Sequence, residues 1–212
     1  MIEVMICDDH QIVRDGLSQI LTLYSDVKVV NALSTGESLF KVLKKEQPDV
    51  LLLDISLPGR SGLEVLKQVK ITHPNIAVLI LSMYPEDQFA IRMLKAGASG
   101  YLNKDTAPEV LIEAIRAIAS GGEYISNEVA NLLVGEVTKE NEELPHKVLS
   151  DREYEVLLLI GQGQSITEIS NKLSLSVKTI STYRSRLILK LGIQSNADLV
   201  KYMIRHGIIG AD

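Results

Sequence analysis

The chain has 212 residues, of which 46% are hydrophobic and 23% charged, a composition typical of a soluble globular protein with one large domain or two small ones. No apolar run approaches the roughly 18 residues that a membrane-spanning helix needs, and the single cysteine excludes an intrachain disulfide. The net charge of −5 is uneven, at −4 over residues 1–125, −3 over 126–149 and +2 over 150–212, which indicates modules with different partners.

Residues 1–121 alternate between strand-like and amphipathic helix-like segments at regular spacing. The expected strands are 2–7, 27–33, 50–54, 76–82 and 100–104. The expected helices are 11–24, 36–46, 62–73, 86–97 and 107–120. Five strands that alternate with five helices predict an α/β fold, a doubly wound five-stranded parallel sheet with helices on both faces. In such a sheet, sites form at the carboxyl ends of the strands.

A polar, acidic stretch separates this region from the rest of the chain. Residues 122–148 begin with a segment that favours a short helix over 126–136, and they continue with TKENEELPHKV, which Pro145 interrupts. Polar runs broken by proline are typical of linkers. We therefore interpret 122–148 as a linker with a possible short helix.

From residue 149 onward the pattern is entirely helical. The expected helices are 151–162, 166–173, 177–191 and 196–206. The sequences SDRE and SITE, directly before two of them, match the capping box, in which serine and glutamate side chains bond free amides at a helix start. A short helix, a tight turn and a second helix form a helix-turn-helix, so we predict that residues 149–212 make a small all-α, four-helix domain.

Polar side chains follow four of the predicted strands. They are Asp8 and Asp9 after the first strand, Asp54 at the end of the third, Ser82 at the end of the fourth and Lys104 at the end of the fifth. Because these strand ends converge on one edge of a doubly wound sheet, the three carboxylates would repel one another unless a cation such as Mg²⁺ lay among them. A lysine and a hydroxyl beside that ion suit a phosphoryl group, so the pattern predicts in-line phosphoryl transfer to a carboxylate.

The cysteine and the histidines are the remaining candidates for nucleophiles or ligands. Cys7 lies in the first predicted strand, and we interpret it as a buried thiol and not as a nucleophile. The histidines are spread along the chain without clustering, so we expect each of them on the surface or in a loop. They are His10, His73, His146 and His206.

The segment 177–191 combines an apolar stripe with a polar face. Ile180, Leu187 and Leu191 recur at helical spacing, and we expect them to be buried. The other face carries short hydroxyls and cations, which suits a DNA groove, because hydroxyls reach base edges and cations bind phosphates. The residues alone leave open the alternative that this face is simply a solvated side of a helical bundle.

Four segments of residues 1–121 resemble the receiver domain of two-component response regulators. They are ICDDH, VLLLDISLPGRSGLEVL, LILSMY and GASGYLNKD. The resemblance implies that Asp54 is the phosphoacceptor. It also implies that Asp8, Asp9, Asp54 and the backbone carbonyl of Ser56 hold Mg²⁺.

The same resemblance implies roles around the phosphoryl group. Ser82 and Lys104 match the positions that contact the phosphoryl group, and Tyr101 matches the aromatic switch position. A sensor histidine kinase is the partner that such a receiver implies, as the donor of the phosphoryl group.

Residues 149–209 resemble the LuxR-type DNA-binding domain, so the whole chain is similar to a NarL/FixJ-type response regulator. The resemblance implies binding to double-stranded promoter DNA and pairing of two such domains through the last helix, as a homodimer. The positions that match base contacts are Ser181, Thr182 and Ser185. The positions that match DNA-backbone contacts are Lys178, Thr179, Tyr183 and Arg184.

The function implied by the two resemblances is that of a transcriptional response regulator. Phosphorylation of Asp54 would release the recognition helix and let a dimer bind paired half-sites. Such a chain is not an enzyme with its own substrate, since it assists only its own phosphoryl transfer and dephosphorylation. The N-terminus has no cationic start typical of a secretory signal, so we expect a cytoplasmic protein.

Two other classes of protein remain open at this point. An aspartyl phosphatase of the haloacid-dehalogenase type also uses aspartate and Mg²⁺, but it has Asp-x-Asp after the first strand, where this chain has the adjacent pair Asp8 and Asp9. A phosphorylation-dependent protein-binding module would not touch DNA, and the basic charge of residues 150–212 argues weakly against it.

Overall fold

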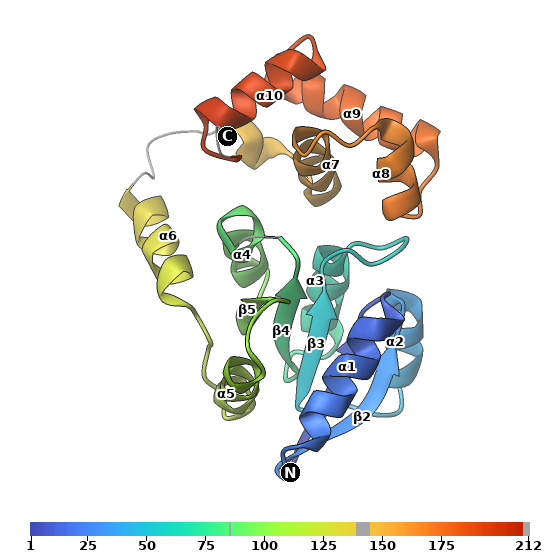
Figure 1. Ribbon diagram of the computed structural model, residues 1–212, viewed down its shortest axis with the longest axis vertical. Coiled ribbons are helices and arrows are strands. Elements are labelled where there is room, and N and C mark those ends of the chain that lie inside the picture. Colours follow the sequence, from blue (N-terminus) through green and yellow to red (C-terminus); the bar gives the residue numbers. More distant parts are fainter. Residues whose placement is uncertain (85, 139–144, 210–212) are drawn as a thin grey trace. The chain divides into compact units, whose positions relative to one another are not determined.

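The computed structural model describes residues 1–84, 86–138 and 145–209, which divide into two compact units, Met1–Thr138 and Lys139–Asp212 (Figure 1). The strands of the first unit are β1 (Ile2–Cys7), β2 (Val27–Leu33), β3 (Val50–Asp54), β4 (Ala77–Ser82) and β5 (Gly100–Asn103). Its helices are α1 (Gln11–Thr22), α2 (Gly36–Leu43), α3 (Gly62–Thr72), α4 (Glu86–Lys95), α5 (Pro108–Ala119) and α6 (Asn127–Thr138).

The five strands form one parallel sheet in the order β2-β1-β3-β4-β5. This arrangement confirms the predicted doubly wound α/β fold. Every residue of β3 is buried, as the apolar run before Asp54 predicts for a strand at the centre of a parallel sheet. The carboxyl end of this central strand therefore lies between its two neighbours, β1 and β4.

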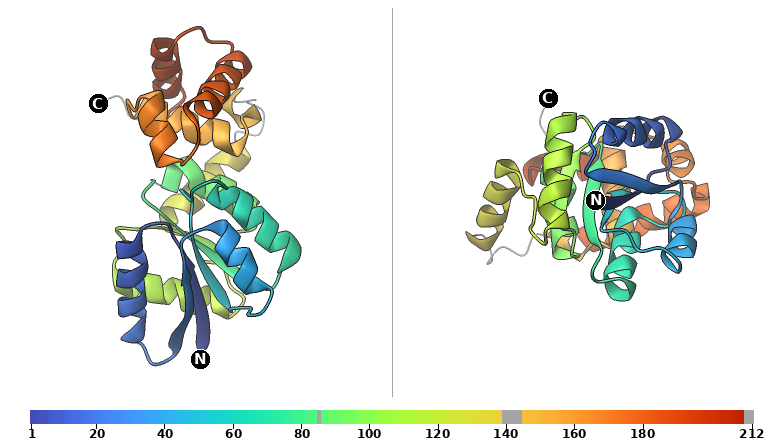
Figure 2. Two further views of the ribbon diagram at one scale, coloured as in Figure 1. Left: turned by 90° about the vertical axis from the view of Figure 1, so that its right-hand side faces the viewer. Right: turned by 90° about the horizontal axis from the view of Figure 1, so that it is seen from below.

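Helices cover both faces of the sheet, because successive strand residues point to opposite sides. On one face, Ile6 and Leu52 belong to a buried cluster that includes Leu21 of α1 and Ile112 and Ile115 of α5. On the other face, α3 contacts β3, and Figure 2 shows α1 and α3 on opposite sides of the sheet. The sheet is therefore the middle layer of three.

Helix α6 belongs to the first unit, although its residues fall in the predicted linker. The segment before it adds to β5 through a bridge between Tyr124 and Gly100, and the Tyr124 N–H donates to Ser99 O at 2.8 Å. Ser126 then accepts from the Val129 N–H at 3.2 Å and donates to Glu86 at the start of α4, and α6 packs on α4. The boundary between the units falls after Thr138, and residues 139–144 of the predicted linker lie outside the described residues.

Five helical elements lie in the part of the second unit that the structure describes. They are the short 3₁₀ helix η1 (Pro145–Val148), α7 (Asp151–Gly161), α8 (Ile166–Lys172), α9 (Val177–Leu191) and α10 (Asn196–Arg205). Helix α7 contacts α8, α9 and α10, so it lies at the centre of the unit. Both predicted capping boxes are present, with Ser150 and Glu153 at the start of α7 and Ser165 and Glu168 at the start of α8. The four predicted helices of this domain are confirmed.

The turn between α8 and α9 is tight and uses an unusual backbone conformation. Ser174 has φ of 52°, in the left-handed region that costs a non-glycine residue about 1–2 kcal/mol. Leu173, directly before Ser174, and Ile180, in the first turn of α9, are fully buried and hold the turn against the core of the unit. Across the described ranges, none of the helices is long and apolar enough to span a membrane.

Two of the histidines cluster, contrary to the expectation from the sequence. His146 of η1 and His206 after α10 lie with ring centroids 6.0 Å apart, and Tyr202 lies 4.3 Å from His206. The Tyr202 hydroxyl is 3.1 Å from Nδ1 of His146. The sequence missed this cluster because it joins the two ends of the unit, which only the packing of η1 near α10 brings together.

Candidate functional site

The parallel register brings the carboxyl ends of four strands to one edge of the sheet. Cys7 is level with Leu53, Asp54 with Leu81, and Ser82 with Asn103. The residues that follow or end these strands are therefore neighbours in space although they are far apart in the sequence. This edge carries Asp8, Asp9, Asp54, Ser82 and Lys104, which we call the acidic edge.

Lys104 lies between two of the carboxylates. Its Nζ is 2.6 Å from Asp8 Oδ2 and 3.0 Å from Asp54 Oδ2. All three side chains are buried, with exposed fractions of 3% for each aspartate and 8% for the lysine. The Lys104 N–H donates to Ser82 O at 2.8 Å, which fixes where the lysine leaves the backbone. The ammonium therefore serves two buried carboxylates at once.

The environment shifts the pKa values of this pair in ways that follow from burial and charge. Burial raises the pKa of Asp54, the charge of Asp8 adds to the rise, and Lys104 opposes it. Burial acts to lower the pKa of Lys104, but attraction to Asp54 and Asp8 outweighs it and raises the pKa above its usual value. Lys104 is thus a firmly charged ammonium, whereas Asp54 is a desolvated and more basic carboxylate, which suits a nucleophile.

A close backbone approach holds the loop that follows Asp54. The Gly62 N–H donates to Ile55 O at 2.8 Å, and a Cβ at Gly62 would lie 2.2 Å from Asp54 O. Ser56 lies in this loop, and its backbone N–H bonds to the Asp54 carboxylate and moderates its raised pKa. The Ser61–Glu64 capping box then starts α3 and anchors the far end of the loop. Only glycine fits at position 62.

Ser82 and Tyr101 are linked through the backbone of Tyr84. The Tyr84 N–H donates to Ser82 Oγ at 3.0 Å, and the Tyr101 hydroxyl donates to Tyr84 O at 2.9 Å. Tyr101 is fully buried, so the side chain at the predicted switch position points inward in this structure, and burial raises its pKa. The hydroxyl of Ser82 is thereby connected to β5 through a hydrogen-bonded path.

Asp9 is paired with His10 and not with Lys104. Its Oδ1 lies 2.8 Å from His10 Nδ1, and its side chain is 28% exposed. Asp8 is also tied by its backbone, because Arg14 Nη1 donates to Asp8 O at 2.7 Å. The sequence pattern identified neither His10 nor Arg14 as a neighbour of the site, although the spacing of Arg14, one turn of helix after His10, was a usable signal.

The acidic edge fits a hard divalent cation. Ligand atoms of Asp8, Asp9, His10 and Asp54 all lie within 4.8 Å of one another. Three carboxylates face a single lysine, which leaves an excess of negative charge that a divalent ion would balance. Carboxylate oxygens are the ligands that Mg²⁺ prefers, so Asp8, Asp9 and Asp54 are suited to hold it. Cys7 is buried beside them, as predicted, and burial together with the Asp54 charge raises its pKa to about 12, which keeps it a thiol.

A second candidate site is the polar face of α9. Lys178, Ser181, Thr182 and Ser185 are exposed, and Thr179, Tyr183 and Arg184 are half-buried. Ile180 and Leu187 are fully buried on the opposite side, as predicted, whereas Leu191 is only half-buried in the last turn. A shallow hollow of about 300 Å³ on this helix is lined by Lys178, Thr179, Thr182, Tyr183 and Arg186.

Two arginines of α9 differ in how they are held. Arg184 Nε donates to Asn196 Oδ1 at 2.8 Å, so this guanidinium is fixed beside the start of α10. Arg186 is exposed and lines the hollow with Lys178, although sequence analysis did not place it among the DNA contacts. The exposed face therefore offers Lys178 and Arg186 as cations that an anionic partner reaches without breaking that hydrogen bond.

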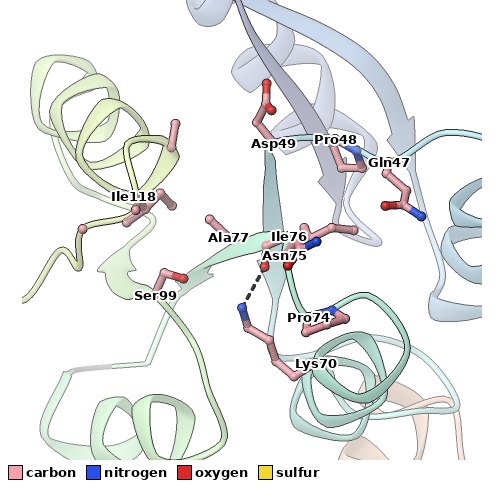
Figure 3. A pocket seen from close by; sticks show the side chains of 13 residues that line it. Gln47, Pro48, Asp49, Lys70, Pro74, Asn75, Ile76, Ala77, Ser99 and Ile118 are labelled. Carbon is pink, nitrogen blue, oxygen red and sulfur yellow. Dashed lines mark hydrogen bonds between the residues drawn. The ribbon is translucent and has the colours of Figure 1, made fainter.

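The opposite edge of the sheet has a separate pocket of about 410 Å³. Figure 3 shows that it is lined by residues at the amino ends of the strands, including Asp49, Ile76 and Ser99. Its lysine, Lys70, donates to Ile76 O at 2.7 Å, and burial lowers its pKa. The Lys70 ammonium is therefore engaged by a backbone carbonyl. The pocket contains none of the residues of the acidic edge.

Comparison with known proteins gives two family matches. Residues 4–116 match the response regulator receiver domain, and residues 147–203 match the bacterial regulatory proteins of the luxR family. The response regulator UvrY of Escherichia coli (strain K12) is 37% identical over 213 residues, which cover 100% of this chain and 98% of UvrY.

Solved structures resemble the chain over nearly its whole length. RcsB from Salmonella enterica serovar Typhimurium, bound to promoter rprA in the presence of the phosphomimetic BeF3⁻, has a TM-score of 0.65 and 30% identity, covering 95% of this chain and 97% of that one. A structure of two RcsB dimers bound to two parallel DNAs has a TM-score of 0.59 and 31% identity, with the same coverage.

Proposed function

Because the chain belongs to the DNA-binding response regulators of two-component systems, we propose that a sensor histidine kinase phosphorylates it on Asp54 with Mg²⁺ present, and that the phosphorylated form binds paired promoter half-sites as a dimer. The observation that carries this proposal is the position of Lys104 Nζ, 3.0 Å from Asp54 and 2.6 Å from Asp8. The same ammonium that now pairs with two carboxylates lies beside the oxygen Oδ2 of the proposed phosphoacceptor.

Asp54 is the nucleophile in the proposed reaction. Its carboxylate oxygen attacks the phosphorus, a P–O bond forms, and the P–N bond to the kinase histidine breaks. Mg²⁺ held by Asp8, Asp9, Asp54 and the Ser56 carbonyl would neutralise charge on the transferring oxygens. Lys104 and Ser82 donate hydrogen bonds to the same group from buried positions, where such bonds are strong.

Phosphorylation changes the charge balance of the acidic edge. The phosphoryl group adds roughly one negative charge and new acceptor oxygens, which compete with Asp8 for Lys104 and accept a hydrogen bond from the Ser82 hydroxyl, whose oxygen holds the Tyr84 N–H. Since Tyr84 O also holds Tyr101, a shift of Ser82 is transmitted to β5. Phosphorylation shifts the population toward the active conformation only to the extent that this conformation binds the phosphoryl group more tightly than the inactive one does.

The DNA-binding part of the proposal is supported by the exposed face of α9. Lys178 and Arg186 are available to phosphates, and Ser181 and Thr182 are available to base edges. RcsB, which shares about 30% of its residues with this chain, is described as bound to promoter DNA and as a dimer on DNA. We propose the same mode of binding here, with the recognition helix in the major groove.

The direct test is phosphorylation by a small phosphodonor with Mg²⁺, read out by intact mass. We expect one phosphoryl group per chain in the wild type, none in Asp54→Asn, and one in Asp15→Asn, which alters an exposed carboxylate on α1. Persistent labelling of Asp54→Asn at the same stoichiometry would refute the acceptor assignment. Steady hydrolysis of added phosphate esters would instead favour the phosphatase alternative.

The second test is genome-wide mapping of bound DNA with and without the phosphodonor. We expect sites that contain two related half-sites and that gain occupancy on phosphorylation. A chain that is labelled on Asp54 yet retains no promoter DNA would favour the protein-binding module.

A further inference from the structure

His10 lies against the proposed metal ligands, and the proposed function gives it no role. Its Nδ1 is 2.8 Å from Asp9 Oδ1 and 3.4 Å from Asp8 Oδ1. These separations are close to the distance of about 3 Å that separates adjacent ligand atoms of an octahedral ion with bonds of 2.0–2.1 Å. The imidazole therefore stands where a further ligand of the same ion would stand.

The backbone of His10 is fixed while its ring is accessible. The His10 N–H donates to Asp8 Oδ1 at 2.8 Å, and His10 O accepts from the Arg14 N–H at 3.1 Å at the start of α1. The side chain itself is 64% exposed, so solvent and ions reach the ring without movement of the core. A ligand that is held at its backbone and open at its ring needs little reorganisation to bind.

An imidazole changes which ions a carboxylate site prefers. Carboxylates, carbonyls and waters suit Mg²⁺, whereas imidazole suits first-row transition-metal ions such as Fe²⁺, Ni²⁺ and Zn²⁺. We infer that His10 is a direct ligand of the metal site at the acidic edge and makes it bind these ions more tightly than a site with oxygen ligands alone. The inference rests on the proposed function, since it takes Asp8, Asp9 and Asp54 as the metal ligands.

The test uses Co²⁺ and Mg²⁺ as probes of the full-length chain, by calorimetric titration. We expect His10→Ala to weaken Co²⁺ binding at least about tenfold, as the loss of a supporting side chain does in other metal sites. The same substitution should change Mg²⁺ affinity less than about twofold. His73→Ala, which removes a histidine at the end of α3, is the matched control and should change neither.

Nuclear magnetic resonance separates coordination from a nearby hydrogen bond. With ¹⁵N-labelled histidine, bound Co²⁺ should give an imidazole nitrogen signal with a large contact shift, which requires a metal–nitrogen bond. This signal should be absent in His10→Ala and retained in His73→Ala. Equal Co²⁺ affinity in His10→Ala, or Co²⁺ binding without that signal, would overturn the inference and leave the metal site intact. If Asp9→Asn leaves both affinities unchanged, the metal assignment of the proposed function itself fails.

Discussion

The acidic edge and the polar face of α9 use charge in opposite ways. At the acidic edge, Asp8, Asp54 and Lys104 come from three strand ends and are almost completely buried, so each changes the free energy of the others. On α9, Lys178 and Arg186 lie on one helix and are exposed, so water and salt screen each of them separately. The comparison teaches that the first site is a coupled unit, whereas the second is a sum of nearly independent contacts.

The largest expected effect is that of Lys104→Ala, which leaves two buried carboxylates without their ammonium. We expect the opening free energy of β3 and β4, measured by native-state hydrogen exchange, to fall by about 3–5 kcal/mol. The matched substitution on α9 is Arg186→Ala, which should change the unfolding free energy of its own unit by less than about 0.5 kcal/mol. Equal effects of the two substitutions would show that the acidic edge is not a coupled unit.

A smaller loss is expected from Gly62→Ala, because its Cβ would lie 2.2 Å from Asp54 O. Displacement of the loop should lower the unfolding free energy by about 1–3 kcal/mol and slow phosphorylation, since it moves the proposed nucleophile. The control is Gly16→Ala in α1, where nothing lies within 4 Å of an added Cβ, and it should stabilise the chain by about 1 kcal/mol. If Gly62→Ala had the unfolding free energy and the phosphorylation rate of the wild type, the loop after Asp54 would have adjusted to the added Cβ without displacing Asp54.

Asp54→Asn should stabilise the fold. Burial and Asp8 raise the pKa of Asp54 above the unfolded value of about 3.9, so the folded chain holds this proton more tightly than the unfolded one. The ionised carboxylate therefore lowers stability at pH 7, and Asp54→Asn should raise the unfolding free energy by about 1 kcal/mol.

Denaturant unfolding at a series of pH values checks the sign. The gain in unfolding free energy from Asp54→Asn should be complete at pH values above the pKa of Asp54 in the folded chain. It should vanish as the pH falls below about 4, where the carboxyl is protonated in the folded and unfolded states alike. An advantage that grows toward low pH would contradict the assigned direction. Asp15→Asn, on the exposed side of α1, is the control and should show no such change.

The smallest effect on stability is expected from Lys178→Ala, which should leave unfolding unchanged. Each contact with a DNA phosphate steepens the fall of log affinity with log salt concentration by about 0.9. The slope measured for Lys178→Ala should therefore be shallower by about 0.9 than that of the wild type. Ser181→Ala should leave the slope unchanged and alter base preference instead. An unchanged slope in Lys178→Ala would remove this residue from the DNA contacts.

The sequence by itself determined the elements and the order in which they occur. Apolar runs and helical patterns predicted the ends of the strands to within one residue and those of the helices to within three, since these signals depend on neighbours within one turn or strand. Capping boxes at Ser150 and Ser165 fixed helix starts for the same local reason. The convergence of Asp8, Asp54 and Lys104 was predictable as well, because parallel strands end at one edge.

How these side chains share partners depends on the packed fold. Lys104 pairs with Asp8 and Asp54 while Asp9 turns to His10, a choice made by burial and side-chain conformation that no spacing encodes. The docking of α6 on α4, the hydrogen bond of Arg184 to Asn196 and the cluster of His146 with His206 likewise join distant segments. Their free energies depend on the packed arrangement, which exists only once the whole unit has folded.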